Sequence, residues 1–185
     1  GGYGNDFTAC DTVSCSIGER PRLRADSEDH VGRTEDVCCG ELPPALAADT
    51  AALLAFKAGG DAGGDLSSWD PAASPCGAFW NIETAGWAGV LCCASYSGYA
   101  CTGANAGRVT LLRLDNQDGL SGTLEALAPL TVLTYLSLYR GWSVSGSLDS
   151  LAGLTDLTYI SMQGNTLVSG NVSSLAGMVG LTSFD

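Results

Sequence analysis

Cysteine is the residue type with the clearest chemical meaning in this sequence. A zinc site in a cytosolic protein would show CxxC or HxxxH spacing, whereas this chain has one CxxxxC and two CC doublets. The eight cysteines form two groups of four, each of which we expect to form its own disulfides. Disulfides in turn indicate an oxidising compartment. The two groups are Cys10, Cys15, Cys38 and Cys39, and Cys76, Cys92, Cys93 and Cys101.

No other set of residues supports catalysis or metal binding. The only histidine, His30, has acidic neighbours at Asp26, Glu28 and Asp29, a composition typical of a solvated loop. A Ser-His-Asp arrangement would have to use this histidine, which lies in a short segment with no sheet to hold it. The sequence contains no P-loop, GxSxG or HExxH motif. We therefore expect no enzymatic activity, no cofactor and no metal.

The charge of the chain excludes two further classes of partner. Its 185 residues carry a net charge of −12, with no basic stripe. Binding to nucleic acid or to an anionic membrane surface requires clustered lysine and arginine, so neither is expected. No apolar run approaches the ~20 residues of a membrane helix. The sequence begins without Met and without an apolar signal region, which indicates a processed chain or a fragment.

The C-terminal part contains an internal repeat with a period of 24 residues. Apolar residues recur in an LxxLxL pattern, and a Ser-Gly pair and an LxxLxxL pattern follow each time in the same register. The LxxLxL patterns begin at Val109, Leu133, Leu157 and Leu181, and the last stops at Phe184-Asp185. LxxLxL predicts a short strand with one apolar side, Ser-Gly a tight turn, and LxxLxxL a partly helical return segment. One unit cannot bury its own apolar side, but stacked units share a core and a parallel sheet.

These units resemble plant-type extracellular leucine-rich repeats (LRRs), although the asparagine of that consensus is present only as Asn165, with Gln117 and Gly141 at the matching positions. The preceding segment resembles the N-terminal cap of the same family. Residues 48–57 match its capping helix, with Asp49 or Thr50 as the N-cap, and residues 87–92 match its WxGVxC motif. The resemblance covers residues 48–185.

The resemblance implies an α/β solenoid, a right-handed LRR stack with a short parallel sheet and a helical, disulfide-bonded N-cap. We assign residues 46–108 to the cap and 109–185 to three full repeats and a truncated fourth. Within the cap, the family's WxGVxC cysteine is Cys92, which implies a Cys76–Cys92 bridge and leaves Cys93 for Cys101.

Residues 1–45 form a separate cysteine-rich module, which resembles small four-cysteine modules of microalgal surface proteins. Its pairing is either Cys10–Cys38 with Cys15–Cys39 or Cys10–Cys39 with Cys15–Cys38. The segment is too short for a core without such cross-links.

The binding surface expected of such a stack is the face of the sheet that points away from the core. Residues between the leucines of each strand lie there, and Tyr135 and Tyr159 should stack. A column of threonines, one from each repeat, flanks this face. The candidate binding residues are Arg113, Asp115, Tyr135, Ser137, Tyr139, Tyr159, Ser161 and Gln163. One N-glycosylation sequon, Asn171-Val-Ser173, follows the third Ser-Gly pair and should be exposed.

We expect a secreted or cell-surface interaction module that recognises a protein, a peptide or a glycan. The alternative is a structural subunit of a surface coat, a fibre or another extracellular assembly. The strand edge of the truncated fourth repeat needs a cover. That cover is either further repeats beyond residue 185 or another chain, including a second copy of this one.

Overall fold

The computed structural model describes most of the chain from residue 44 onward. The described residues are 20–21, 39–40, 44–71, 75–76, 87–93, 105, 107–117, 119–141 and 143–185. In the N-terminal module they comprise two short strands, β1 (Arg20–Pro21) and β2 (Cys39–Gly40), which pair antiparallel. The predicted bridges of Cys10, Cys15 and Cys38 lie outside these residues.

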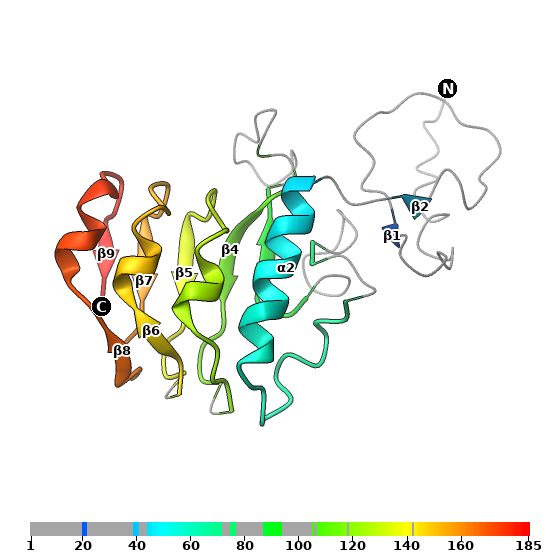
Figure 1. Cartoon of the computed structure of the whole chain (residues 1–185), viewed down its shortest axis with the longest axis horizontal. Coiled ribbons are helices and arrows are strands. Elements are labelled where there is room, and N and C mark those ends of the chain that lie inside the picture. The colour runs from blue at the N-terminus through cyan, green and yellow to red at the C-terminus, as the bar shows by residue number, and fades with distance from the viewer. Residues whose placement is uncertain are drawn as a thin grey trace, which may run out of the picture.

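The described residues from 44 to 185 form a solenoid, and five of their strands lie side by side in one main sheet (Figure 1). The sheet has the order β3-β4-β5-β7-β9, and all neighbours after the antiparallel β3–β4 pair are parallel. The register joins Tyr135 to Tyr159 and Tyr159 to Ser183, so each step along the stack is the 24-residue period. The strands are β3 (Val90–Cys92), β4 (Val109–Arg113), β5 (Tyr135–Ser137), β7 (Tyr159–Ser161) and β9 (Ser183–Phe184).

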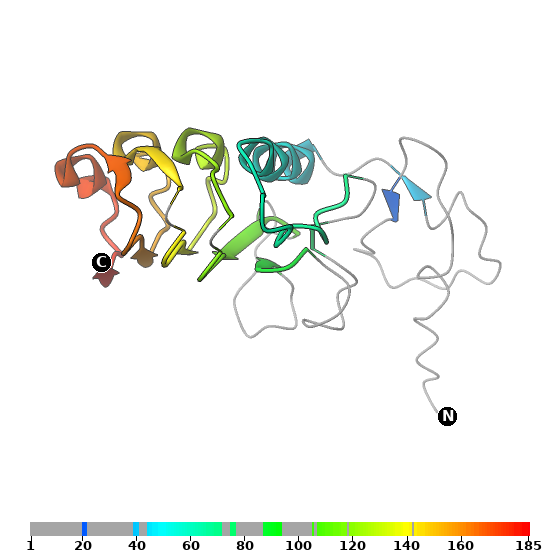
Figure 2. The same cartoon turned by 90° about the horizontal axis from the view of Figure 1, so that it is seen from below.

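The return segments form the opposite side of the solenoid as a row of short 3-10 helices beside helix α2 (Figure 2). They are η2 (Leu124–Leu127), η3 (Leu148–Leu151) and η4 (Val172–Gly177). The repeat leucines fill the space between this row and the sheet. The burial predicted from the repeat is confirmed, because each of the following is at most 5% exposed: Leu136, Leu138, Leu151, Leu154, Ile160 and Leu175.

A second, smaller parallel sheet is formed by the segments that connect the strands of the main sheet to the 3-10 helices. Its strands are β6 (Ser145–Ser147) and β8 (Leu167–Ser169), and a bridge from Thr123 to Ser145 extends it to the preceding repeat. The turn predicted for Ser145-Gly146 is therefore wrong, because the pair lies inside a strand. Gly146 has φ 112°, a backbone conformation that residues other than glycine rarely adopt.

Helix α2 (Pro44–Ala58) packs against the first repeat and covers that end of the core (Figure 1). It begins at Pro44, as is common for proline at the first helical position, and Gly59 and Gly60 follow its last turn. The predicted N-caps, Asp49 and Thr50, are therefore wrong, because both lie within the helix. A Cβ on Gly122 would come within 2.6 Å of the Phe56 ring, so the helix and the repeat approach too closely for any other residue.

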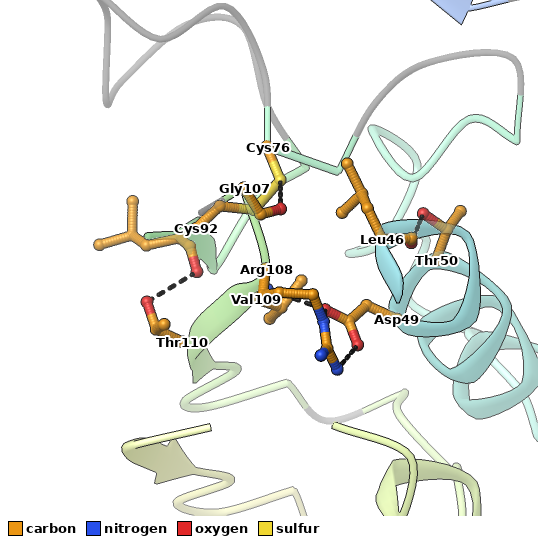
Figure 3. Close-up of a disulfide and its surroundings, with 10 residues drawn as sticks. Leu46, Asp49, Thr50, Cys76, Cys92, Gly107, Arg108, Val109 and Thr110 are labelled. Atoms are coloured by element: carbon orange, nitrogen blue, oxygen red, sulfur yellow. Dashed lines mark hydrogen bonds and ion pairs between the residues drawn. A yellow bond between two sulfur atoms is a disulfide. The ribbon is translucent and has the colours of Figure 1, made fainter. Parts of the chain in front are cut away.

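Asp49 has a different role, which links the cap to the first repeat (Figure 3). Its carboxylate accepts two hydrogen bonds from Arg108, at 2.7 and 2.8 Å, and a third from the backbone N–H of Val109 at 2.9 Å. The Asp49 side chain is 0% exposed and that of Arg108 is 12% exposed. The hydrogen bonds that Arg108 donates to Asp49 raise the pKa of Arg108, although burial alone would lower it. The pair holds α2 at the start of β4.

The loop after α2 is fastened by its aromatic side chains and by Lys57. The rings of Trp69 and Trp87 stack at 5.3 Å, and Trp69 Nε1 donates to the Ala88 carbonyl. Lys57, the only lysine in the sequence, donates to the carbonyls of Leu66 and Trp69. Both tryptophans are buried. This packing places the WxGV segment against the edge of β4.

The expected Cys76–Cys92 disulfide is present. It joins the loop after α2 to the end of β3, the strand that pairs with β4 (Figure 3). Cys93 is disulfide-bonded as well, and its expected partner, Cys101, lies outside the described residues. The bridge therefore fixes the strand that closes the first edge of the parallel sheet.

Candidate functional site

Side chains of the main sheet alternate between the core and the opposite side, which we call the outer face of the sheet. Leu136 and Ile160 point to the core and are 0% exposed, whereas Tyr135 and Tyr159 are half-buried on the outer face. The two tyrosine rings stack with centroids 4.3 Å apart and planes 3° from parallel. The register forces this contact, because Tyr135 and Tyr159 are partners on adjacent strands. The stacking expected from the 24-residue period is thus present.

A polar cluster lies beside the tyrosines at the end of β4. Arg113 Nε donates to one oxygen of Asp115 at 2.6 Å, and Ser137 Oγ donates to the other at 2.5 Å. Burial alone would raise the pKa of Asp115, but the bonds from Ser137 and Arg113 and the charge of Arg113 lower it below its usual value. The carboxylate of Asp115 therefore stays ionised and pairs with Arg113, whose side chain remains largely exposed.

Two of the predicted binding residues are not accessible. Ser137 and Ser161 lie on the outer side of their strands, yet each is only 2% exposed. A serine is short, so larger side chains on the same face can cover it. Ser137 therefore holds Asp115 in place and presents almost no surface of its own.

A third group of side chains comes from residues just after the strands in sequence. Tyr139 is half-buried and Gln163 is exposed, and the guanidinium of Arg140 lies 5.0 Å from the centroid of the Tyr139 ring. Arg140 has φ 56°, a left-handed conformation that Asn116 and Gly164 adopt at the matching positions of the neighbouring repeats. Sequence reasoning missed Arg140, although the period aligns it with Gly164 and so marks a residue in an unusual backbone position.

The threonine column forms a ladder along the edge of this face. Each threonine after the first donates two hydrogen bonds to the backbone carbonyl of the threonine one repeat earlier. One comes from its hydroxyl and the other from its backbone N–H. The O–H···O distances lie between 2.9 and 3.0 Å for Thr134, Thr158 and Thr182. The ladder fixes the strand spacing on which the tyrosine stack depends.

Asn165 makes a similar contact between repeats past the other end of the strands. It is 8% exposed, and its Nδ2 donates to the carbonyls of Leu138 and Met162 at 2.7 and 3.0 Å. Gln117, at the matching position of the first repeat, reaches only the nearby Asp115 carbonyl. The asparagine ladder is therefore limited to one rung between the second and third repeats.

Asn171 lies on the flank of the third repeat, away from the outer face of the sheet. It is exposed and is the N-cap of η4, where its Oδ1 accepts the backbone N–H of Ser173 at 2.9 Å. This bond uses the oxygen of the amide and leaves its nitrogen to solvent.

Within the described part of the chain, no three His, Cys, Asp or Glu side chains come together as metal ligands. No helix there is long and apolar enough to cross a membrane. What the outer face offers is a rigid pair of aromatic rings with charged and amide groups around it, an arrangement suited to binding.

Comparison with known proteins places this geometry in context. The family model described as the leucine-rich repeat N-terminal domain matches residues 46–93. No curated protein matches the sequence.

Among solved structures, the LRR ectodomain of the Arabidopsis receptor kinase HAESA has a TM-score of 0.53 and 25% identity over 75% of this chain. A plant ice-binding protein also has a TM-score of 0.53, at 19% identity, and so supports the fold alone. The aligned region spans 20% of the HAESA chain and 39% of the ice-binding protein. The described residues from 46 to 185 therefore have the fold of a leucine-rich-repeat solenoid, and residues 46–93 resemble the N-terminal domain of leucine-rich-repeat proteins.

Proposed function

We propose that this chain is a non-enzymatic recognition module of the extracellular space, which binds a protein, peptide or glycan partner through the outer face of its sheet. The observation that carries the proposal is the stacked Tyr135–Tyr159 pair. Each ring combines an apolar surface with a hydroxyl, and stacking has already removed much of its freedom before a partner arrives. Ordered aromatic side chains are typical anchors of binding sites.

The relatives support a binding role. HAESA, with 25% identity, has been solved with the peptide hormone IDA and the co-receptor SERK1. The Cys76–Cys92 bridge supports an oxidising, extracellular setting. Three strand intervals of about 4.8 Å give the face a width of ~15 Å, which suits a peptide or an oligosaccharide better than a large globular surface.

The tyrosine pair can be tested by a double substitution. We expect Tyr135→Ala/Tyr159→Ala to weaken binding at least ~30-fold, because two anchors of at least ~1 kcal/mol each are lost. Binding would be measured against displayed random peptides and an immobilised glycan array, with Val179→Ser as the matched control. Val179 is 96% exposed and lies outside the sheet. Thermal unfolding of each variant verifies the fold.

Two results would contradict this proposal. Unchanged binding in the double variant would move the site away from the tyrosines. Filaments of the pure protein in negative-stain microscopy, with no ligand in either screen, would favour the alternative of a structural subunit of an extracellular assembly.

We also propose that Asn171 carries an N-linked glycan. The amide nitrogen is free in an exposed sequon, and Leu167 and Val172 nearby are each 58% exposed, an apolar surface that a glycan would cover. Secretion from a eukaryotic host should give a protein that loses mass with an N-glycosidase, and Asn171→Gln should remove that loss.

A matched pair of variants separates glycosylation from folding. Ser173→Ala removes the sequon and keeps the Asn171 cap, whereas Ser173→Thr keeps both. We expect no glycan on the first and a glycan on the second. A glycosidase-insensitive mass for the secreted wild-type chain would contradict the assignment.

A further inference from the structure

The two faces of the Tyr159 ring have different surroundings. One face stacks on Tyr135 at 4.3 Å. On the other side, the residue in register on β9 is Ser183, whose side chain is too short to cover a phenol ring. Neighbouring strands are ~4.8 Å apart, close to the spacing of stacked planar groups. The position above Ser183 is therefore the place where one further planar group can extend the tyrosine stack.

The charge around this position favours a cation. The net charge of the chain is −12. Asp185 follows Phe184 on the outer side of the sheet, next to Ser161 in the same register, and is exposed. Of the two arginines near this face, Arg113 is already paired with Asp115, and Arg140 lies over the Tyr139 ring. A planar cation above Ser183 would therefore meet the Tyr159 ring and an acidic side chain together.

The same face already contains one such contact. The guanidinium of Arg140 lies 5.0 Å from the centroid of the Tyr139 ring, within the range of a cation–π interaction. A guanidinium is planar and stacks on aromatic rings, whereas the lysine ammonium is a strongly hydrated point charge. The arginine side chain thus fits the stack better than lysine.

We propose that the outer ring face of Tyr159 is a subsite for an arginine side chain of a partner peptide, with Asp185 as its counter-ion. This inference rests on the proposed function, because it names the partner chemistry of the same face. It narrows the partner from any protein, peptide or glycan to a peptide segment that presents arginine.

The test begins with a random linear peptide library, from which peptides that bind the folded chain are selected. The Tyr159→Leu variant is present in solution as a competitor, so that peptides that do not need the Tyr159 ring are removed. We expect the selected peptides to share an arginine. Replacing that arginine by citrulline, which keeps the shape and removes the charge, should weaken binding about three- to tenfold. On a Tyr159→Leu/Asp185→Asn background the same exchange should have no effect, since coupled partners are not additive.

The controls separate this subsite from the site as a whole. Tyr159→Phe keeps the ring and should keep the arginine preference, and Val179→Ser, which lies outside the sheet, should leave it unchanged. Thermal unfolding verifies that each variant is folded. Peptides that need the tyrosine pair but no arginine would overturn this inference and leave the proposed function intact. Peptides that bind equally well to Tyr135→Ala/Tyr159→Ala would overturn both, and a selection that returns no peptide would overturn the arginine subsite alone.

Discussion

Asp49→Ala is expected to lower the free energy of unfolding by about 3–5 kcal/mol, because it leaves the largely buried guanidinium of Arg108 without its partner. The same substitution leaves the backbone N–H of Val109 without its acceptor at the start of β4. The loss is a large fraction of the total for an ordinary domain, about 5–15 kcal/mol. Denaturant unfolding measures it directly.

Two further variants make this result specific. Asp49→Asn keeps the size of the side chain and removes its charge, and should recover only part of the loss. Asp156→Ala removes an exposed aspartate and should change stability by less than ~0.5 kcal/mol. A double-mutant cycle with Arg108→Gln isolates the coupling of the pair. Stability within 1 kcal/mol of wild type for Asp49→Ala would contradict a structural role for this contact.

The sequence indicated a capping helix within residues 48–57, with Asp49 or Thr50 as its N-cap, but the helix begins earlier, at Pro44. Asp49 and Thr50 are residue types that favour N-caps, and that local preference suggested the wrong boundary. The partner of Asp49 is 59 residues away along the chain. A single sequence has no local signal for such a contact, so the role of Asp49 emerges only from the packing of α2 against the first repeat.

The repeat region was predictable because its period fixes both strand position and register. A 24-residue step in sequence places Tyr135 next to Tyr159 before any coordinates are known. The 24-residue period does not predict how many residues separate paired positions outside the main sheet. The second sheet pairs Ser145 with Leu167, an offset of 22 residues, so the sequence alignment did not reveal that sheet.

The candidate site was predictable only in part, for a related reason. Alternation along a strand decides on which side of the sheet a residue lies, but not whether its neighbours cover it. Ser137 and Tyr135 lie on the same side, yet Ser137 is 2% exposed while the tyrosine is half-buried. Arg140 was missed because it follows the strand and reaches Tyr139 from a left-handed backbone position. Side-chain length and turn geometry, which the LxxLxL pattern does not contain, determine which residues a partner can touch.

Removal of the Cys76–Cys92 bridge is the second change with a large expected effect. The two cysteines are 16 residues apart in sequence, and closing a loop of about this size restricts the unfolded chain by about 3 kcal/mol. We therefore expect Cys76→Ser/Cys92→Ser to lower the free energy of unfolding by about 2–5 kcal/mol, measured by denaturant unfolding.

The location of the bridge predicts which strands lose stability when it is removed. β3 pairs with β4 at the first edge of the parallel sheet, and the bridge ties the end of β3 to the loop that holds the cap. Without it, amide hydrogen exchange should accelerate in β3 and at the β3-facing amides of β4, while β7, two strands further along the stack, should keep its protection. Equal acceleration in β3 and β7 would mean that the bridge stabilises the solenoid as a whole. Unchanged exchange in β3 would mean that the tryptophan packing and Asp49 already hold this edge closed. A selective effect on β3 would establish the disulfide as the closure of an edge that would otherwise be free to pair with another chain.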